Sequence, residues 1–363
     1  MAGYLQNCWY AFGWAHELEN GMLARTALDM RIVAFRTADR TPAAVLDRCP
    51  HRFAPLSRGA VRDGVLHCAY HGLGFSGSGE CVHNPFGSVP HKAAVRSFPL
   101  VERDHILWIW PGESALADPA TIPDFSFHHK SNEQDWVVHG YIHMRTGYQI
   151  EIDNLMDLSH IETVHRGTFG GRGYINSGQL ELREVGEEIH ANWWMPSVPL
   201  YDLTTGAKLD SRADHFLDTR WSPPSALRLH FSFMPAGTYT GRENSAREDL
   251  PGQFQAHLLT PETQRTTHYF WSSKRPTDMN AWMTEEVGRA LVLTAFEQED
   301  KPLLEAIEAN MPGEFWSSRP IILPNDGGGV RVRRRLARLI RNEQGTPGAS
   351  AVVEPPEELE TQQ

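Results

Sequence analysis

The sequence predicts an α+β protein in which a small all-β domain precedes a larger domain of strands and helices. Residues 1–112 contain short apolar runs such as RIVAFRT and HILWIWPG, separated by turn-forming residues, and this pattern is typical of short strands joined by turns. Beyond residue 125, strand-like runs such as ALRLHFSFM accompany helical periodicity over about 148–165 and 280–309. The stretch 113–125 predicts a linker, which places the larger domain at 126–342.

Composition narrows the functional classes. The chain has 363 residues and a formal net charge of −11, which argues against non-specific binding to nucleic acid. It contains no apolar run of about 18 residues or more, so no membrane span is expected. The N-terminus lacks a secretory signal pattern, and a cytoplasmic location is therefore the default expectation. Residues 343–363 have the composition of a disordered tail.

Two of the four cysteines lie in the stretch 49–71, and each is followed closely by a histidine. Cys49 is followed by His51, and Cys68 is followed by His71. In an extended chain, residues two positions apart are separated by about 6.6 Å, so their side chains reach two neighbouring metals more easily than one. Two cysteines on one iron and two histidines on the other describe a Rieske [2Fe–2S] centre.

Three other interpretations of this stretch remain open on spacing alone. A zinc site is one, although zinc sites usually space their ligands as C-x₂₋₄-C and H-x₃₋₅-H. Buried thiols and hydrogen-bonded histidines without a metal are the second. A disulfide is the third, and a reducing cytosol disfavours it. Cys8 and Cys81 match no ligand position and are expected to be small apolar residues.

A second group of candidate ligands lies in EIDNLMDLSHIETVHRG, residues 151–167. Asp153, Asp157 and His160 have the spacing i, i+4 and i+7, which is one face of a helix. His165 lies five residues past His160, so the helix must end or distort if both rings are to meet one ion. Two histidines and one carboxylate form the facial triad of non-haem Fe(II) oxygenases. The same spacing also suits a polar helix face without a metal.

Together the two motifs resemble those of the Rieske non-haem iron oxygenases. CPHR and CAYHGLGF match the pattern C-x-H and C-x₂-H-G-x₂-F, and D-x₃-D-x₂-H-x₄-H matches the iron motif of the catalytic (alpha) subunits. The group that the chain resembles most comprises the dicamba and vanillate O-demethylase oxygenase components. The resemblance implies a Rieske [2Fe–2S] cluster, a mononuclear Fe(II) and a START-like helix-grip catalytic domain, in which a curved antiparallel sheet packs against a long C-terminal helix. Gly72 is expected at a tight turn beside the cluster.

The third iron ligand is also implied by the resemblance. It is Asp300 in the segment FEQEDKPLLEAIE, with Glu297 and Glu299 as rivals on the same predicted helix. Pro302 removes one helical N–H, and a bend is expected just beyond the ligand.

The resemblance implies a head-to-tail homotrimer in which electrons pass from the cluster of one subunit to the iron of its neighbour. Asp157 matches the aspartate that bridges a cluster histidine and an iron histidine across that interface, with His71 and His160 as its partners. Asn154 is expected near the iron.

The electron source is expected to be a separate NAD(P)H-dependent reductase, a ferredoxin or both, because the chain lacks a dinucleotide-binding fingerprint. Its glycine clusters GGRG (170–173) and GGG (327–329) lack the strand-turn-helix setting and are expected to be loops. The basic stretch VRVRRRLARLIR is expected to be a solvated helix face, with docking of an acidic carrier as the alternative.

The reaction implied by the resemblance is monooxygenation of a small aromatic substrate by O₂, as O- or N-demethylation or another dealkylation. Within the same class, the alternative is ring or side-chain hydroxylation, including cis-dihydroxylation. Outside it, the alternative is a Rieske electron carrier with a ligand-binding domain. The residues expected to contact the substrate are His230, His257 and Leu291.

Overall fold

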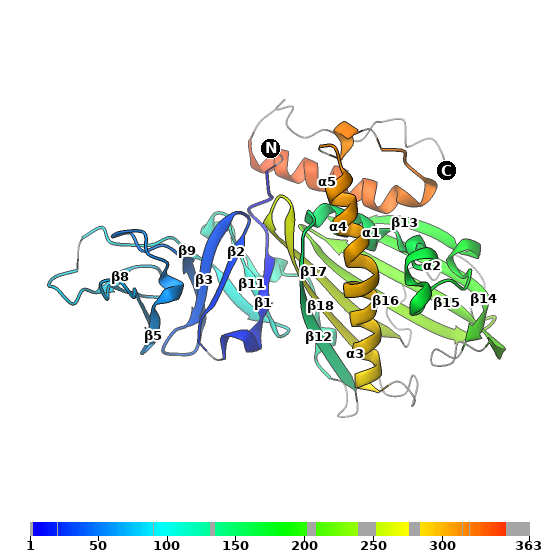
Figure 1. Ribbon diagram of the computed structural model, residues 1–363, viewed down its shortest axis with the longest axis horizontal. Helices are drawn as coiled ribbons and strands as arrows, with labels where there is room; N and C mark the ends of the chain where they lie inside the picture. Colours follow the sequence, from blue (N-terminus) through cyan, green and yellow to red (C-terminus); the bar gives the residue numbers. More distant parts are fainter. Residues whose placement is uncertain are drawn as a thin grey trace. The chain divides into compact units, whose positions relative to one another are not determined.

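The computed structural model describes residues 3–19, 21–89, 91–130, 135–201, 208–238, 252–275, 284–313, 315–318 and 320–345. These residues belong to two compact units (Figure 1). One comprises Tyr4–Asp124 with Thr260–Thr267, and the other comprises Gly3, Phe125–Leu259 and the described residues from His268 onward. The predicted α+β fold is confirmed, because the first unit is built of strands and the second combines a large antiparallel sheet with helices. No helix in the described part of the chain is long and apolar enough to cross a membrane.

The first unit contains three small sheets, with strand orders β1-β11-β10, β2-β3-β4-β9 and β5-β6-β7-β8. Apolar strand residues such as Val33, Phe35 and Phe75 form its core, and the thiols of Cys49 and Cys68 pack into the same cluster. The elements are β1 Tyr10–Trp14, η1 Ala15–Leu18, β2 Leu23–Ala27, β3 Met30–Arg36, β4 Pro42–Leu46, η2 Leu56–Arg58, β5 Ala60–Arg62, β6 Val65–His67, β7 Gly74–Phe75, β8 Cys81–His83, β9 Ser97–Phe98, β10 Leu100–Arg103 and β11 Ile106–Ile109.

Most of the expected linker is bound to the first unit. It carries the short 3₁₀ helices η3 (Ser114–Leu116) and η4 (Pro119–Thr121). Trp9 Nε1 donates a hydrogen bond to the main-chain oxygen of Asp118 at 2.9 Å, and Ile122 is buried. These contacts extend the first unit to Asp124. Residues 346–363, most of the predicted tail, lie outside the described residues.

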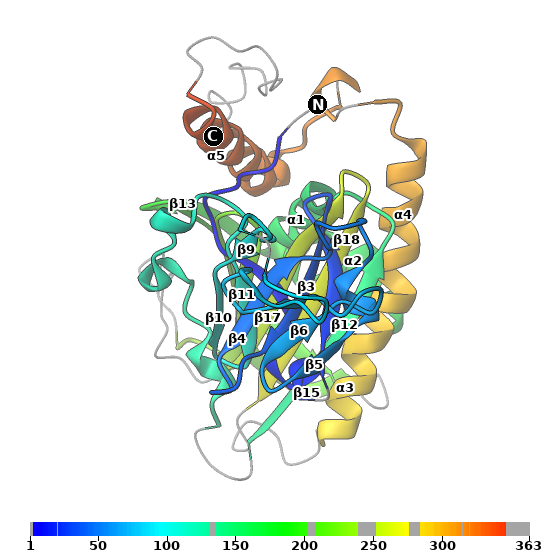
Figure 2. The same cartoon turned by 90° about the vertical axis from the view of Figure 1, so that its left-hand side faces the viewer.

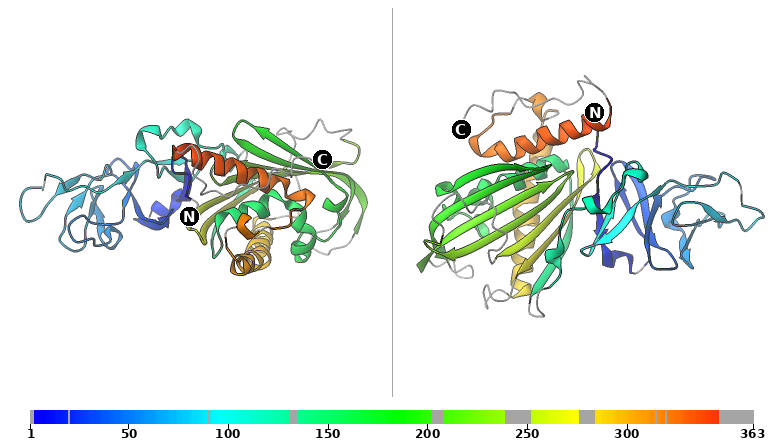
Figure 3. Two further views of the ribbon diagram at one scale, coloured as in Figure 1. Left: turned by 90° about the horizontal axis from the view of Figure 1, so that it is seen from above. Right: turned by 180° about the vertical axis from the view of Figure 1, so that it is seen from behind.

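The second unit is organised around a seven-stranded sheet with the order β12-β18-β17-β16-β15-β14-β13 (Figure 3). The pairs from β13 to β17 are antiparallel and joined in sequence order, which is the pattern of a meander. The strands are β12 Trp136–Met144, β13 Gln179–Val185, β14 Glu188–Tyr201, β15 Lys208–Ser222, β16 Ala226–Pro235, β17 Gln253–Thr263 and β18 Thr266–Arg275.

One face of this sheet is covered by helical segments. Trp193, Leu217 and Phe231 lie opposite one another on β14, β15 and β16 and therefore point to the same side. Their side chains cluster with Leu158 and Ile175, which belong to the helical segments between β12 and β13. We call this side of the sheet the helix face. Its apolar side chains position the helical segments over the strands.

The helical segments fall into two groups, apart from η5, which precedes β12. The first group lies between β12 and β13, and the second follows β18, where α3, η11 and α4 form a rod alongside the sheet (Figures 1 and 2). The helices are η5 Ser126–His128, α1 Tyr148–Met156, η6 Leu158–His160, α2 Ile161–Val164, η7 His165–Gly167, η8 Ile175–Ser177, α3 Glu285–Leu293, η11 Thr294–Asp300, α4 Lys301–Asn310, η12 Trp316–Ser318, η13 Pro324–Asp326 and α5 Gly327–Glu343.

The helix predicted over 148–165 is shorter than expected. It ends at Met156, because Asp157 has an extended conformation with φ −120° and ψ 91°. The Asp157 carboxylate accepts a hydrogen bond from the Ser159 N–H at 3.0 Å and so caps the following 3₁₀ helix. Asp153, Asp157 and His160 therefore do not share one continuous helix face. Between His160 and His165 the helix must also end or distort, and this expectation is confirmed, because α2 ends at Val164 and His165 has φ −92° and ψ 29°.

The bend expected beyond Asp300 is replaced by a distortion before it. Thr294–Asp300 forms a π-helical segment, a feature that often occurs at functional sites. Pro302 is the second residue of α4, directly after this segment. The rod continues past the proline (Figure 2).

Both sequence expectations for the C-terminal helix were wrong. The GGG stretch forms the first turn of α5 rather than a loop. A Cβ atom on Gly329 would lie 2.8 Å from Oδ1 of Asp153, so the glycine permits close contact with α1. The basic face is not simply solvated, because Arg333 is buried and its guanidinium bonds both carboxylate oxygens of Asp153.

The pair between Arg333 and Asp153 gives a prediction about stability. Arg333→Ala leaves a largely desolvated carboxylate without its cation and should lower the free energy of unfolding by about 2–3 kcal/mol. The control is Arg338→Ala, whose exposed pair with Glu187 should contribute less than about 1 kcal/mol. Chemical denaturation followed by circular dichroism measures both values. Equal losses in the two variants would contradict the assigned role of Arg333.

Candidate metal centres

The two Cys–His stretches fold into loops with the same backbone hydrogen bonds. In the first loop, the Cys49 N–H donates to the Ala54 oxygen at 2.9 Å, and the Phe53 N–H donates to the Cys49 oxygen at 2.9 Å. In the second loop, the Cys68 N–H donates to the Leu73 oxygen at 2.8 Å, and the Gly72 N–H donates to the Cys68 oxygen at 3.0 Å. Each loop thus holds its cysteine at one end and turns back within five residues.

A residue with positive φ reverses the chain in each loop. Gly72 has φ 73°, which confirms the expected tight turn, and Phe53 occupies the equivalent place with φ 60°. A non-glycine residue in this region is strained, and the repeated hydrogen bonds of the loop hold it there.

The loops bring two thiols and two imidazoles together. Cys49 and Cys68 are buried, and the rings of His51 and His71 lie 4.6 Å apart between centroids. Burial raises the pKa of the Cys49 thiol, and the neighbouring Cys68 raises it further, so a bound cation would favour the thiolate of Cys49. The Nδ1 atom of His71 is buried and has no hydrogen-bond partner. This donor set fits an iron–sulfur cluster, and all four cysteines are free, so none forms a disulfide.

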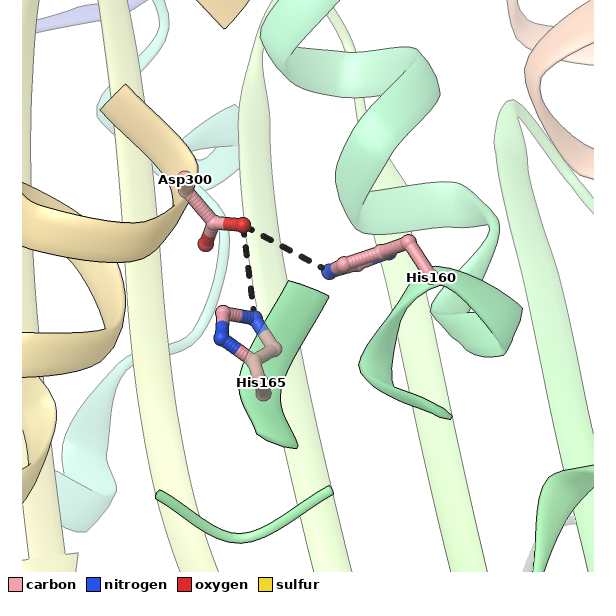
Figure 4. Close-up of side chains that lie close together, drawn as sticks. All are labelled: His160, His165 and Asp300. Carbon is pink, nitrogen blue, oxygen red and sulfur yellow. Dashed lines mark ion pairs between the residues drawn. The ribbon is translucent and has the colours of Figure 1, made fainter. Parts of the chain in front are cut away.

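A second cluster of three candidate ligands lies on the helical segments of the other unit. His160, His165 and Asp300 place one ligand atom each within 4.8 Å of one another. Nε2 of His165 is 3.3 Å from Oδ1 of Asp300, and Nε2 of His160 is 3.8 Å from the same oxygen (Figure 4). His160 ends η6, His165 follows α2, and Asp300 ends the π-helical segment.

Hydrogen bonds at Nδ1 turn both rings so that Nε2 faces Asp300. Nδ1 of His160 lies 2.6 Å from the main-chain oxygen of Asp157, and Nδ1 of His165 lies 2.8 Å from Oε2 of Glu299. In each case the acceptor calls for a proton on Nδ1, which leaves the Nε2 lone pair for a metal.

The electrostatics of this cluster favour a cation. Asp300 is 7% exposed, and its Oδ1 has no hydrogen-bond partner. Burial lowers the pKa of His165, but the carboxylates of Asp300 and Glu299 outweigh burial and raise that pKa overall. The site thus draws positive charge to the point at which the three side chains converge. Two histidines and one carboxylate fit a mononuclear iron with open coordination positions.

The whole chain is similar to known proteins. The family of vanillate O-demethylase oxygenase C-terminal domains matches residues 144–342, and the Rieske [2Fe–2S] domain family matches residues 8–99. The oxygenase component of chloroacetanilide N-alkylformylase from Rhizorhabdus wittichii (strain DC-6 / KACC 16600) is 37% identical over 96% of this chain and 99% of its own length. The oxygenase component of dicamba O-demethylase from Stenotrophomonas maltophilia is 39% identical, with 93% and 98% covered. The chain belongs to the Rieske oxygenase family.

Structural similarity agrees with this membership. A crystal structure of dicamba monooxygenase with non-haem iron and dicamba has a TM-score of 0.78 and 36% identity, and it covers 95% of this chain and 99% of that chain. The resemblance inferred from the motifs is thereby confirmed, as are the fold and the enzyme class. The cofactors of Rieske oxygenases are the [2Fe–2S] cluster and a mononuclear non-haem iron.

The structure separates two of the residues expected to contact substrate. His257 lies on the helix face, where its ring approaches Phe296 of the π-helical segment at 5.4 Å between centroids. His230 follows Leu229 and precedes Phe231, which both point to the helix face, so its own side chain points to the opposite face. There its ring stacks on Phe254 at 4.3 Å. The sequence pattern alone could not fix which of two adjacent strand residues faces the iron.

Leu291, Asn154 and Asp157 are the other residues predicted to lie at the site, and they differ in their structural surroundings. Leu291 is half-buried on α3, and Asn154 is half-buried on α1. The Asp157 carboxylate accepts a hydrogen bond from Nδ2 of Asn325 at 2.6 Å, whereas His160 contacts the main-chain oxygen of Asp157. Nothing in the sequence pattern indicated Asn325.

A buried acid beside the metal ligands was also missed. Glu151 on α1 is 2% exposed, and burial, followed by the nearby charge of Asp300, raises its pKa well above the ordinary value. Burial likewise lowers the pKa of His257 to about 3, so that this ring is neutral at physiological pH. Nδ1 of His257 is 2.6 Å from the Tyr269 hydroxyl, and its Nε2 is buried without a partner.

The raised pKa of Glu151 predicts a pH dependence of stability. Above the ordinary pKa of glutamate, the unfolded chain releases a proton that the folded protein keeps, so this residue lowers stability as pH rises. Glu151→Gln has no carboxyl proton to release. The difference in free energy of unfolding between this variant and the parent should therefore shift in favour of the variant as pH rises from 5 to 8. Urea midpoints of chelator-treated protein measure this shift, with exposed Glu297→Gln as the control. A difference between Glu151→Gln and parent that does not change with pH would contradict the assignment.

Proposed function

We propose that this chain is the oxygenase component of a system that removes an alkyl group from the oxygen or nitrogen of a small aromatic compound. The observation that carries the proposal is that one chain combines two paired Cys–His loops with a convergent cluster of two histidines and one buried aspartate. One relative is named an N-alkylformylase and another an O-demethylase, which supports dealkylation as the reaction.

The proposed cluster ligands are the four residues of the paired loops. Cys49 and Cys68 hold one iron of the [2Fe–2S] cluster through Sγ, and His51 and His71 hold the other. The buried thiols and the partnerless Nδ1 of His71 support this assignment. Cys8 and Cys81 are not ligands, and Cys81 Sγ instead lies 3.5 Å from the His83 oxygen.

The proposed ligands of the mononuclear iron are His160, His165 and Asp300. When bound, this iron supplies the activation of O₂ with electrons that the cluster relays. The residues of this chain present the Nε2 atoms of two imidazoles and one buried carboxylate. His257 and Leu291 are proposed to face the substrate, with the neutral Nε2 of His257 available for a hydrogen bond. Asn154 is proposed to lie near the iron.

The overall reaction consumes one substrate, one O₂, two electrons and two protons. When the alkyl group is methyl, insertion of one oxygen atom into one of its C–H bonds gives a hemiacetal or a hemiaminal. That product breaks its bond between carbon and the heteroatom, which yields formaldehyde and the free phenol or amine. The second oxygen atom leaves as water.

Partners and location are part of the proposal. The two electrons come from NAD(P)H through a separate reductase, a ferredoxin or both, and the word "component" in the names of the relatives supports such a system. We propose a homotrimer in which Asp157 bridges His160 and a neighbouring subunit's His71. A cytoplasmic location is proposed because the four cysteines are free. The proposed domains are 1–112 for the Rieske domain and 126–342 for the catalytic domain.

The proposed reaction predicts release of formaldehyde. Purified protein with a surrogate reductase, NADH and O₂ should convert at least one member of a panel of aromatic ethers, N-alkyl amides and aryl sulfonates. Formaldehyde, measured by derivatisation, should equal the substrate consumed, and Asp300→Asn should give none while its cluster remains reducible by dithionite. A product that keeps every carbon atom would favour hydroxylation instead, and no product with a reducible cluster and bound iron would favour an electron carrier.

The bridging role of Asp157 gives a separate prediction. Asp157→Asn keeps one side-chain oxygen, which can still accept from the Ser159 N–H and cap η6. The Asn325 amide, which donates to the other carboxylate oxygen in the parent, can turn its own oxygen toward the new NH2 group, so folding and both metal contents should match the parent. Turnover should fall by about 10–100-fold, because loss of the carboxylate removes the proposed contact between subunits. Metal analysis and steady-state oxygen consumption test this, and normal turnover would remove the bridge from the account.

A further inference from the structure

Glu299 brings a second carboxylate to the His165 ring. It immediately precedes Asp300 at the end of the π-helical segment. Its Oε2 lies 2.8 Å from Nδ1 of His165, while Oδ1 of Asp300 lies 3.3 Å from Nε2 of the same ring. Two consecutive acidic residues therefore bracket one imidazole at its two nitrogens.

The contact is anchored on both sides. Oε2 of Glu299 also accepts a hydrogen bond from Oγ1 of Thr168 at 2.8 Å, and Thr168 follows His165 by three residues. A Cβ atom on Gly167 would lie 2.6 Å from Oε1 of Glu299, so the absence of a side chain there makes room for the carboxylate. The Glu299 side chain is 15% exposed, which shields its charge from water.

The Nδ1 atoms of His160 and His165 face different hydrogen-bond acceptors. Nδ1 of His165 faces a carboxylate, whereas Nδ1 of His160 faces the main-chain oxygen of Asp157 at 2.6 Å. A carboxylate that accepts from one imidazole nitrogen fixes the tautomer and increases the basicity of the other nitrogen, more than a neutral carbonyl does. The iron site is therefore electronically unequal at its two nitrogen positions.

We propose that Glu299 is a positioning residue that holds His165 with its proton on Nδ1 and so strengthens Nε2 as an iron donor. This inference rests on the proposed ligand set of His160, His165 and Asp300. Glu299 is then not the third iron ligand, because its Oε2 atom already accepts hydrogen bonds from His165 and Thr168. Thr168 keeps the carboxylate in register with the ring.

The same segment supplies a matched control. Glu297 lies two residues earlier on the π-helical segment and is exposed, so Glu297→Ala changes an acidic residue at a similar distance along the chain without touching the ring. Glu299→Ala removes the hydrogen bond and the charge, whereas Glu299→Gln keeps an acceptor oxygen without the charge. Thr168→Val removes only the anchor.

The experiment measures Fe(II) affinity at the mononuclear site of protein that retains its cluster. We expect Glu299→Ala to weaken Fe(II) binding by about 10–100-fold, Glu299→Gln to fall between this variant and the parent, and Glu297→Ala to match the parent. The electron paramagnetic resonance signal of the nitric oxide adduct of Fe(II) should shift in Glu299→Ala at saturating iron. The signal of the dithionite-reduced cluster should not change, which shows that the first unit is intact.

Each outcome decides between specific statements. Parent-like affinity and an unchanged nitric oxide signal in Glu299→Ala would overturn the positioning role. If Glu299→Ala abolishes iron binding and Asp300→Asn leaves it intact, Glu299 is itself the ligand, and its positioning role is overturned. Parent-like iron binding in both variants would instead remove the proposed ligand set and, with it, this inference. If Glu299→Ala does not fold, Glu299→Gln and Thr168→Val must show the shifted signal, and the role is overturned if they do not.

Discussion

Two breaks in the helical path, at Asp157 and at His165, are the constraint on which the candidate iron site depends. In an uninterrupted α-helix, residues five positions apart differ by about 140° around the axis, so His160 and His165 would point to different sides. α1 ends before both histidines, because Asp157 is extended, and α2 ends at Val164, because His165 leaves the α conformation with φ −92° and ψ 29°. Both rings can therefore turn toward Asp300. The break at Asp157 also frees its main-chain oxygen, which meets Nδ1 of His160 instead of a helical N–H. These two departures from regular helix create the convergence and the orientation of the ligands.

Helix α5 and the residues just before it stabilise the break at Asp157. Arg333 on α5 binds Asp153 near the end of α1, and Asn325, just before α5, binds the Asp157 carboxylate and the Ser159 hydroxyl at 2.6 Å each. Gly329 allows α5 to approach α1 closely enough for these contacts. The GGG stretch and the arginine cluster therefore serve the metal site through packing, whereas GGRG (170–173) lies in a loop as expected.

The sequence predicted the metal ligands better than the contacts that hold those ligands in place. Spacing brought out Cys49, Cys68 and the histidine motif, because ligands on short segments keep a recognisable separation, while Asp300 needed the family resemblance. The location of the helix break, the π-helical segment before Pro302 and the contact of Asn325 with Asp157 depend on tertiary contacts that no local pattern contains. His230 shows the same limit, because a one-residue shift along β16 exchanges the two faces of the sheet.

If the paired Cys–His loops hold a two-iron centre and His160, His165 and Asp300 hold a single iron, anomalous scattering at the iron absorption edge from crystals of reconstituted protein can locate both. Two adjacent peaks are expected beside Cys49, Cys68, His51 and His71, and one separate peak where the other three side chains converge. A map that lacks either feature, or that shows iron bound to other residues, would mean that these residues do not hold the two centres.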